Sequence, residues 1–314
     1  MDFSILIQVI LLIGGFALLI KGADFFVDGA SNIASILKVP TIIVGLTIVA
    51  LGTSAPEAAV SITSSLTGSN AMAVSNVIGS NLFNMLIIIG VATLFGDLLM
   101  EEDVLNRDLP FLVAITFLLA VFIFMGGDII PFEGIILLVL LVGYVIYIIR
   151  NSRKTGAMSY VDKPKFSLPV SIIFIVGGLI GIVIGGDLVV NSASDIAMAL
   201  GMSETLVGLT IVAIGTSLPE LVTSITALKK GENDLVIGNV IGSNIFNILF
   251  VLGASSAISK ITINSGILVD VAFMIVATVF CFIFGKTQEK YDKREGIFLI
   301  GLFAVYMIFA IWRN

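Results

Sequence analysis

The chain has 314 residues, of which 58% are hydrophobic and only 12% are charged. Soluble domains carry about 25% charged residues, so this composition predicts a membrane protein with several spans. The net charge of −6, without a basic patch, argues against nucleic acid as a partner. The sequence has no histidine and one cysteine, Cys281. This excludes disulfides, cysteine–histidine zinc sites, Ser-His-Asp triads and haem ligation by histidine.

Apolar stretches of about 20 residues, each long enough to cross ~30 Å of hydrocarbon, recur along the chain. We expect an all-α integral membrane protein with ten transmembrane helices, near residues 3–28, 41–66, 71–98, 108–127, 129–149, 167–191, 204–228, 233–258, 262–285 and 295–312. A polar stretch interrupts this pattern in the middle. We therefore expect a first five-helix repeat at 1–149, a linker at 150–166 and a second five-helix repeat at 167–314.

The distribution of lysine and arginine predicts the orientation of the chain. The loops that follow the odd-numbered spans hold thirteen of these residues, and the opposite side holds two. Lysine and arginine gather in cytoplasmic loops. We therefore expect the protein in the plasma membrane, with the 150–166 linker in the cytoplasm and both termini outside the cell.

The two halves carry the same polar motifs. Residues 52–57 read Gly-Thr-Ser-Ala-Pro-Glu and residues 215–220 read Gly-Thr-Ser-Leu-Pro-Glu, 163 positions later. From 22–84 to 185–247 the halves align without a gap, with 33 identities in 63 positions. Because five spans is an odd number, the second half enters the membrane in the opposite direction. This predicts two inverted-topology repeats, with a substrate site near the midplane where they meet.

The repeated motif predicts a break in the helix that carries it. Pro56 lacks an N–H and clashes with the carbonyl four residues back, at Gly52, where glycine lowers the cost of leaving helical geometry. We expect the carbonyls of Ala50 to Thr53 to be freed, and those of Ala213 to Thr216 in the second copy. Free carbonyls in a membrane are tolerated where they line a cavity or meet a partner such as a cation.

Glu57 and Glu220 follow these breaks directly, and a carboxylate at mid-membrane depth is a functional residue by default. Two glutamates that meet across the pseudo-axis, with oxygen ligands only, favour Ca²⁺ or Na⁺ over transition metals and Mg²⁺. Further oxygens come from small polar residues of both copies. The candidates are Thr53, Ser54, Ser80 and Asn84 in the first half, and Thr216, Ser217, Ser243 and Asn247 in the second.

Other interpretations of these residues remain open. Small polar residues often act as helix–helix contacts, which is an alternative for Ser80 and Ser243. The alternative for the glutamates is a protonated, hydrogen-bonded structural acid. Asn76, Asn81, Asn239 and Asn244 are more typical of packing and hydrogen bonding than of ion ligands. The acidic loop residues Glu101, Glu102, Asp103, Glu232 and Asp234 are expected to be solvated.

The paired motifs resemble the α-repeats of the cation/Ca²⁺ exchanger superfamily, and most closely the prokaryotic Na⁺/Ca²⁺ exchangers. The resemblance covers essentially the whole chain. It implies that Glu57 and Glu220 are the main ligands shared by Ca²⁺ and Na⁺, and that Thr53 and Thr216 donate backbone carbonyls to Ca²⁺. It further implies Na⁺ sites completed by Ala50, Ala213, Ser54, Ser217, Ser80 and Ser243, with Asn84 and Asn247 lining the centre. The spans near 3–28 and 167–191 would slide against the remaining core.

The resemblance implies electrogenic, secondary active Na⁺/Ca²⁺ antiport by alternating access; the alternative is a Ca²⁺/H⁺ antiporter of the same fold. Some members, including K⁺-dependent ones, have aspartate where Asn247 stands, so we expect no K⁺ dependence here. An enzyme is not expected, because an intramembrane protease would need paired aspartates or histidines. No cofactor, nucleic acid or obligate protein partner is expected; the partners are Na⁺, Ca²⁺ and the lipid bilayer.

Overall fold

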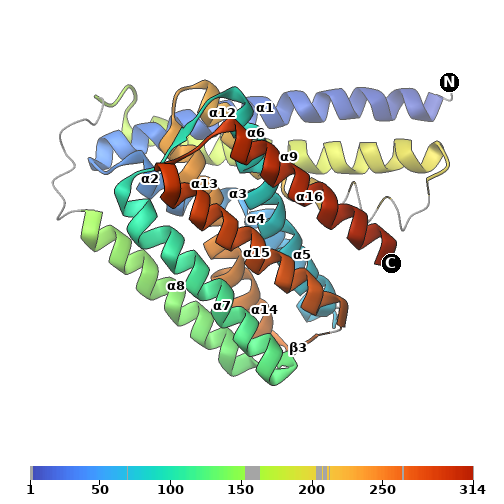
Figure 1. Ribbon diagram of the computed structural model, residues 1–314. Helices are drawn as coiled ribbons and strands as arrows, with labels where there is room; N and C mark the ends of the chain where they lie inside the picture. The colour runs from blue at the N-terminus through green and yellow to red at the C-terminus, as the bar shows by residue number, and fades with distance from the viewer. Residues whose placement is uncertain are drawn as a thin grey trace.

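A computed structural model describes residues 3–68, 70–152, 163–202, 207, 211, 213–263 and 265–313. Helices make up nearly all of this described part (Figure 1). Those of the first half, including π-helices marked η, are α1 (Phe3–Leu37), α2 (Thr41–Val44), η1 (Gly45–Val49), α3 (Ala50–Thr53), α4 (Ala55–Leu66), α5 (Asn70–Phe83), η2 (Asn84–Ile88), α6 (Ile89–Phe95), η3 (Val104–Asp108), α7 (Leu109–Gly126) and α8 (Pro131–Ser152). Those of the second half are α9 (Leu168–Ala199), α11 (Ala213–Gly215), α12 (Leu218–Lys229), α13 (Asn233–Phe246), η6 (Asn247–Leu252), α14 (Gly253–Ile258), α15 (Ser265–Gln288) and α16 (Lys293–Arg313).

The described residues contain eight helices long and apolar enough to cross a membrane. They contain nine if the bent pair Thr41–Thr53 and Ala55–Leu66 counts as one span. The expected span near 204–228 falls partly outside the described residues, which omit 203–206, 208–210 and 212. The other expected spans all have a counterpart among these helices. The chain is therefore an all-α, multi-pass membrane protein.

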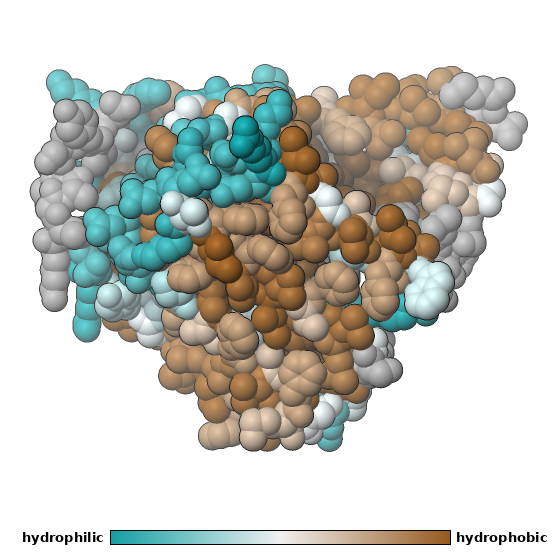
Figure 2. Space-filling model, in the orientation of Figure 1, coloured by the Kyte–Doolittle hydropathy of each residue, from teal (hydrophilic) through white to brown (hydrophobic). Residues whose placement is uncertain are grey.

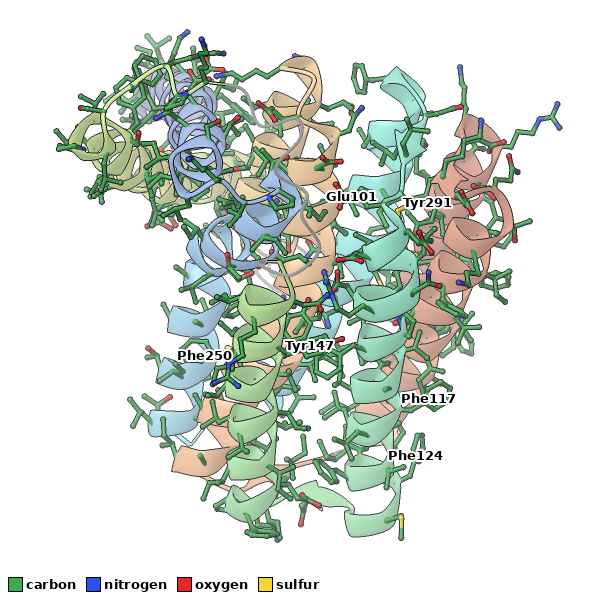
Figure 3. All side chains as sticks on the ribbon, turned by 90° about the vertical axis from the view of Figure 1, so that its left-hand side faces the viewer. Glu101, Phe117, Phe124, Tyr147, Phe250 and Tyr291 are labelled. Atoms are coloured by element: carbon green, nitrogen blue, oxygen red, sulfur yellow. The ribbon has the colours of Figure 1, made fainter. Side chains whose placement is uncertain are left out.

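The outer surface suits a lipid environment. Figure 2 shows hydrophobic residues over most of the visible face, with polar residues gathered toward the end at which α15 ends and α16 begins. Phe117 and Phe124, labelled in Figure 3, lie on α7 and are 47% and 56% exposed. Large aromatic side chains are this exposed in a helix that contacts lipid rather than water.

Two helices that carry the repeated Gly-Ser-Asn motif form the centre of the molecule. In Asn233–Ile258, 94% of the most apolar stretch is buried, and in Ala71–Phe95 the share is 78%. The corresponding share in Ile5–Leu37 is 17%. Polar motifs that would be unfavourable against lipid are thus placed where protein surrounds them.

The long helices α1 and α9 lie side by side and extend past the rest of the bundle (Figure 1). Glycines make this contact close. A Cβ atom on Gly22 would lie 2.7 Å from the carbonyl oxygen of Gly178, and one on Gly185 would lie 2.8 Å from that of Gly15. Small residues allow membrane helices to approach to backbone contact, so α1 and α9 pack as a tight pair.

Two short antiparallel ribbons join the halves at opposite ends of the bundle. Strand β1 (Leu98–Leu99) pairs with β4 (Lys290–Tyr291), and β2 (Asp128–Ile129) pairs with β3 (Ile261–Thr262). The registers correspond, since Leu98 faces Tyr291 in one ribbon and Ile261 faces Ile129 in the other. The ribbons thus cross-link each half to the other in the same way.

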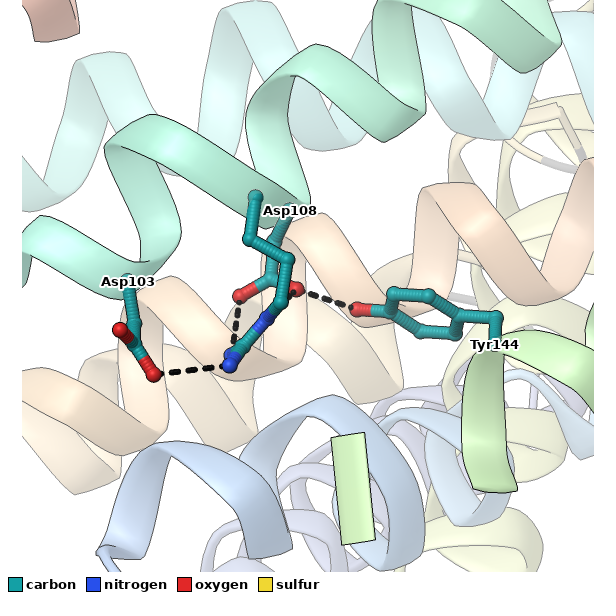
Figure 4. A network of polar contacts seen from close by, with 4 residues as sticks. Asp103, Asp108 and Tyr144 are labelled. Atoms are coloured by element: carbon teal, nitrogen blue, oxygen red, sulfur yellow. Dashed lines mark hydrogen bonds and ion pairs between the residues drawn. The ribbon is translucent and has the colours of Figure 1, made fainter. Parts of the chain in front are cut away.

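An ion-pair network around the buried residue Asp108 joins η3 to α8 (Figure 4). Arg107 donates to both carboxylate oxygens of Asp108, at 2.8 and 2.9 Å, and to Asp103 at 2.7 Å. The hydroxyl of Tyr144 on α8 donates to Asp108 at 2.9 Å. The expectation that Asp103 is simply solvated is therefore wrong, because Arg107, four residues further along the helix, reaches it.

Candidate functional site

The helix break predicted for the first half is present. The segment Thr41–Thr53 ends at Ser54, whose φ and ψ are −81° and 7°, and the next helix is bent away by 48°. Pro56 lies in the first turn of α4, where a missing N–H is tolerated. The carbonyl of Ala50, expected to be free, still accepts the backbone N–H of Ser54 at 3.0 Å. That expectation was wrong because Pro56 removes only its own N–H, so helical bonding continues up to Ser54.

The second half repeats this geometry at Ser217, where φ is −93° and ψ is 5°, directly before α12. Pro219 again lies in the first turn of the new helix. The backbone N–H of Ser217 bonds to the carbonyl of Ile214 at 3.1 Å, which tightens the end of α11. Ala213 begins α11, and its side chain lies outside the described residues.

Each helix break places a serine within hydrogen-bond distance of the glutamate of the other half. Ser54 Oγ donates to Glu220 Oε1 at 3.0 Å, and Ser217 Oγ donates to Glu57 Oε1 at 3.3 Å. Both glutamates and Ser217 are fully buried, and Ser54 is 3% exposed. The two Ser-x-Pro-Glu turns therefore interlock, which brings both carboxyl groups to the same place in the protein interior.

Asparagines on the central helices hold the two turns in position. Asn76 on α5 donates to the backbone carbonyl of Glu57 at 3.3 Å and to Ser61 at 3.0 Å. Asn239 on α13 donates to the backbone carbonyl of Glu220 at 3.4 Å and to Ser224 at 3.0 Å. These residues act through the turns, in agreement with their predicted role in hydrogen bonding.

Several buried oxygen atoms around the interlocked turns have no hydrogen-bond partner among the described residues. In the described part of the chain, Glu57 Oε2, Glu220 Oε2, Thr216 Oγ1 and Asn247 Oδ1 are buried without a hydrogen-bond partner, as are both amide atoms of Asn84. A buried carboxylate oxygen that lacks a partner is costly. Such atoms concentrated at one place are typical of a site completed by a ligand, here one that oxygen donors prefer.

The π-helical turns at Asn84 and Asn247 were not predicted from the sequence. Each asparagine begins a π-helical turn, η2 and η6, and each is fully buried. A π-turn inside an α-helix widens the helix by one residue and is frequent at functional sites. Asn247 Nδ2 donates to Asn81 Oδ1 at 3.1 Å. This contact agrees with the packing and hydrogen-bonding role expected of Asn81.

The two halves of the site are not identical. Ser80 Oγ donates to Glu57 Oε1 at 3.3 Å, whereas Ser243 Oγ lies 3.5 Å from Thr53 Oγ1. Thr53 also donates to Asn239 at 3.0 Å, while the hydroxyl of Thr216 has no described partner. Among the described residues, the hydroxyl of Thr53 thus has more polar contacts than that of Thr216.

The structure therefore brings together both glutamates, their four motif serines, Thr53 and the two asparagines. Among the described residues, no group of three or more Asp, Glu, Cys or His side chains could hold a metal ion. Among the residues that the structure describes, Glu57 and Glu220 are the acidic members of the site. Such an arrangement can bind hard cations through two carboxylates and neutral oxygens.

Comparisons with known proteins agree with this geometry. Residues 7–150 and 170–312 each match the sequence model of the family described as "Sodium/calcium exchanger protein". The chain is 34% identical to "Inner membrane protein YrbG" of Escherichia coli, with 98% of each chain covered. It is 30% identical to "Sodium/calcium exchanger MaX1" of Methanosarcina acetivorans, with 97% of this chain and 98% of that one covered. A solved structure of the sodium-calcium exchanger NCX_Mj superimposes with a TM-score of 0.86 at 28% identity, over 97% of this chain and 99% of the other.

Proposed function

The chain belongs to the sodium/calcium exchanger protein family, and we propose that it is a secondary active antiporter that exchanges Na⁺ for Ca²⁺. The observation that carries this proposal is the pair of interlocked turns. They place Glu57 and Glu220 in the protein interior with one oxygen of each carboxylate free of hydrogen bonds. The relatives named as sodium/calcium exchangers cover nearly the whole chain and support the same assignment.

In this proposal Glu57 and Glu220 are the ligands common to Ca²⁺ and Na⁺. The backbone carbonyls of Thr53 and Thr216 contribute to the Ca²⁺ site. The Na⁺ sites are completed by Ser54, Ser217, Ser80, Ser243, Ala50 and Ala213, and Asn84 and Asn247 line the centre. The unpartnered oxygens of Glu57, Glu220, Asn84 and Asn247 support these roles.

We further propose ten spans in two inverted repeats, with residues 150–166 as the linker between them. Contacts between the halves occur in pairs related by the repeat. The serine–glutamate hydrogen bonds form one such pair, the glycine contacts of α1 and α9 form another, and the strand ribbons form a third. A two-fold axis in the membrane plane would produce this pairing.

The lysine and arginine distribution supports a cytoplasmic linker, with both termini outside. The Escherichia coli relative is named an inner membrane protein, which supports the plasma membrane as the location. In the transport cycle the tight pair of α1 and α9 would slide against the core, alternating access to the site between the two faces. This follows the sliding expected from the family resemblance and from the glycine contacts that make the pair one unit.

The small number of acidic side chains at the site supports Na⁺ as the counter-ion, without K⁺. Asn84 and Asn247 are neutral, so the acidic side chains identified at the site carry at most two negative charges. One Ca²⁺ neutralises two carboxylates, whereas about three Na⁺, as the resemblance implies, leave an excess near +1. Movement of one net charge contributes about 2.3 kcal/mol per 100 mV. The exchange is therefore proposed to be electrogenic, with Ca²⁺ normally extruded.

The test is flux of ⁴⁵Ca²⁺ into vesicles that contain the purified protein. Uptake is expected when an outward Na⁺ gradient is imposed, to be stimulated by an inside-positive potential, and to be unchanged when K⁺ is omitted. The same vesicles without a Na⁺ gradient but with a pH gradient provide the control. Uptake that ignores Na⁺ and follows the pH gradient would replace this proposal with Ca²⁺/H⁺ antiport.

A further inference from the structure

A cluster of charged and polar residues links α1 to the turn between α12 and α13. Lys230 in this turn forms an ion pair with Asp28 at 2.7 Å and donates to the backbone carbonyl of Asp24 at 2.8 Å. Next to it, Ser31 Oγ donates to Glu232 Oε1 at 2.5 Å. Residues 24, 28 and 31 follow helical spacing and share one face of α1. The expectation that Glu232 is simply solvated is therefore wrong.

On the α1 side, the link is anchored to the α1/α9 pair as a whole. Asn32 is 5% exposed and accepts the backbone N–H groups of Lys165 and Phe166 at 2.6 and 3.1 Å. Its amide nitrogen donates to the carbonyl of Phe166 at 2.9 Å and to Ser171 of α9 at 2.7 Å. The start of α9 is thus tied to the same part of α1 that contacts Lys230.

On the other side, the link is anchored to the helices that carry the second half of the site. Helix α12 has Glu220 in its first turn. Helix α13 carries Ser243 and is followed directly by Asn247. Lys230 and Glu232 lie in the short connection between these two helices. A sliding movement of α1 and α9 against the core, as proposed above, would have to separate Lys230 from Asp28.

In the described part of the chain, the opposite face of the molecule has no equivalent charge pair. The positions that correspond to Asp28 and Lys230 in the other repeat are Asn191 and Thr67, both neutral. Thr67 Oγ1 bonds within its own helix, to the carbonyls of Thr63 and Ser64 at 3.0 and 3.2 Å. Ser194, which corresponds to Ser31, has a buried hydroxyl without a described partner. Among the described residues, the charged link is therefore found on one face only.

We propose that Lys230, Asp28, Ser31 and Glu232 form a latch that holds the cytoplasmic side closed and biases the access equilibrium toward the outside. A contact shifts a two-state equilibrium by the difference it makes between the states, and under the proposed sliding this contact would be made in only one of them. Lys230 and Asp28 are 27% and 44% exposed, so the pair is partly screened by solvent. We expect its loss to raise the cytoplasm-open population by up to about fivefold, the upper end for an exposed pair. The inference rests on the proposed alternating access and orientation, and not on which cations are carried.

The experiment is a pulsed-EPR distance measurement on the full-length chain in lipid nanodiscs. Spin labels are placed at Leu37, near the end of α1, and at Lys229 beside the latch, in a Cys281→Ser background. Lys230→Met and Asp28→Asn are each expected to raise the long-distance population by up to about fivefold. The charge exchange Asp28→Lys with Lys230→Asp is expected to return it toward the unmutated value.

Lys260→Met is the matched control, because Lys260 pairs with Asp128 at 2.6 Å beside the β2–β3 ribbon, outside the latch. Raising ionic strength with choline chloride should also populate the long distance in the unmutated chain, but not in Lys230→Met, since salt screens exposed pairs. Unchanged distances in both single variants, or an equal change in Lys260→Met, would overturn the latch. Because the measurement needs no ion gradient, a failed Na⁺-dependent flux with shifted distances would refute the proposed counter-ion alone.

Discussion

Replacement of Glu57 by glutamine tests the candidate site most directly. The substitution keeps the shape of the side chain and one oxygen, so Ser80 and Ser217, which donate to Glu57 Oε1 at 3.3 Å each, retain an acceptor. It removes one of the two buried negative charges and converts the unpartnered oxygen Oε2 into an amide nitrogen. An amide nitrogen donates hydrogen bonds and cannot coordinate a cation.

The expected loss follows from the burial of this carboxylate. Removing one member of a buried, charged contact costs about 2–5 kcal/mol of binding free energy. A tenfold change in affinity corresponds to about 1.4 kcal/mol, so Ca²⁺ affinity should fall between about 30-fold and several thousand-fold. The ion-free protein should not be destabilised, because the variant removes a buried charge that lies close to Glu220 and needs a cation to balance it.

Two measurements separate these effects: ⁴⁵Ca²⁺ flux into vesicles and thermal unfolding with and without Ca²⁺. A ligand at 100 times its dissociation constant stabilises the folded state by about 2.7 kcal/mol. Glu57→Gln should abolish flux and lose this Ca²⁺-dependent rise in Tm, with no fall in the ion-free Tm. Glu102→Gln is the control, since Glu102 lies outside the site and is contacted by Asn106 at 3.5 Å. Normal flux or a retained Ca²⁺-dependent Tm shift in Glu57→Gln would refute the assignment.

Three further outcomes are expected. Gly22→Val should lower Tm and stop flux, because a Cβ at this position would lie 2.7 Å from the carbonyl of Gly178 and overpacking costs about 1–3 kcal/mol. Gly14→Ala is the control and should change neither Tm nor flux, since a Cβ at Gly14 would have nothing within 4 Å. Equal effects of the two substitutions would contradict the role of the α1–α9 contact. Tyr144→Phe should lower the unfolding free energy by about 1–3 kcal/mol, since buried Asp108 loses a donor; an unchanged Tm would count against this network. Burial, with Asp234 and Asp103 nearby, raises the pKa of Glu101 to about 7 from 4.5. The folded state then binds this proton more tightly than the unfolded state, so stability from this group is complete below about pH 4.5 and is lost as pH rises to 7. Glu101→Gln should flatten the dependence of Tm on pH in that window, and a slope equal to that of the parent would refute this role.

Much of the fold could be predicted from local pattern. Apolar runs long enough for the membrane identify nearly every helix, because a lipid environment requires backbone groups to be satisfied within each segment. The break at Ser54 follows from Pro56 and Gly52 for the same local reason. The extent of the break was misjudged at Ala50, because the loss of one N–H leaves the preceding helical hydrogen bonds intact.

Contacts between distant elements could not be predicted in this way. The π-turns that begin at Asn84 and Asn247 lie in sequences that read as ordinary helix. The partner of Glu232 was missed, because a charged residue in a loop has no local signal for the side chain that approaches it from another helix. The partner of Asp103 is different, since Arg107 follows it at the i, i+4 spacing of a helical ion pair and could have been predicted. Lys230 likewise reads as a simple loop charge until α1 is seen beside it.

The sequence by itself determined the class of protein and the chemistry of its site. Hydrophobicity requires a membrane, the repeat pairs Glu57 with Glu220, and the neutral asparagines limit the number of charges. Only the tertiary structure decided which serine meets which glutamate, which oxygens remain free, and that one face carries a charged link while the other does not. The physical reason is that composition and spacing act within a segment, whereas hydrogen bonds and ion pairs across the two halves depend on how the segments pack.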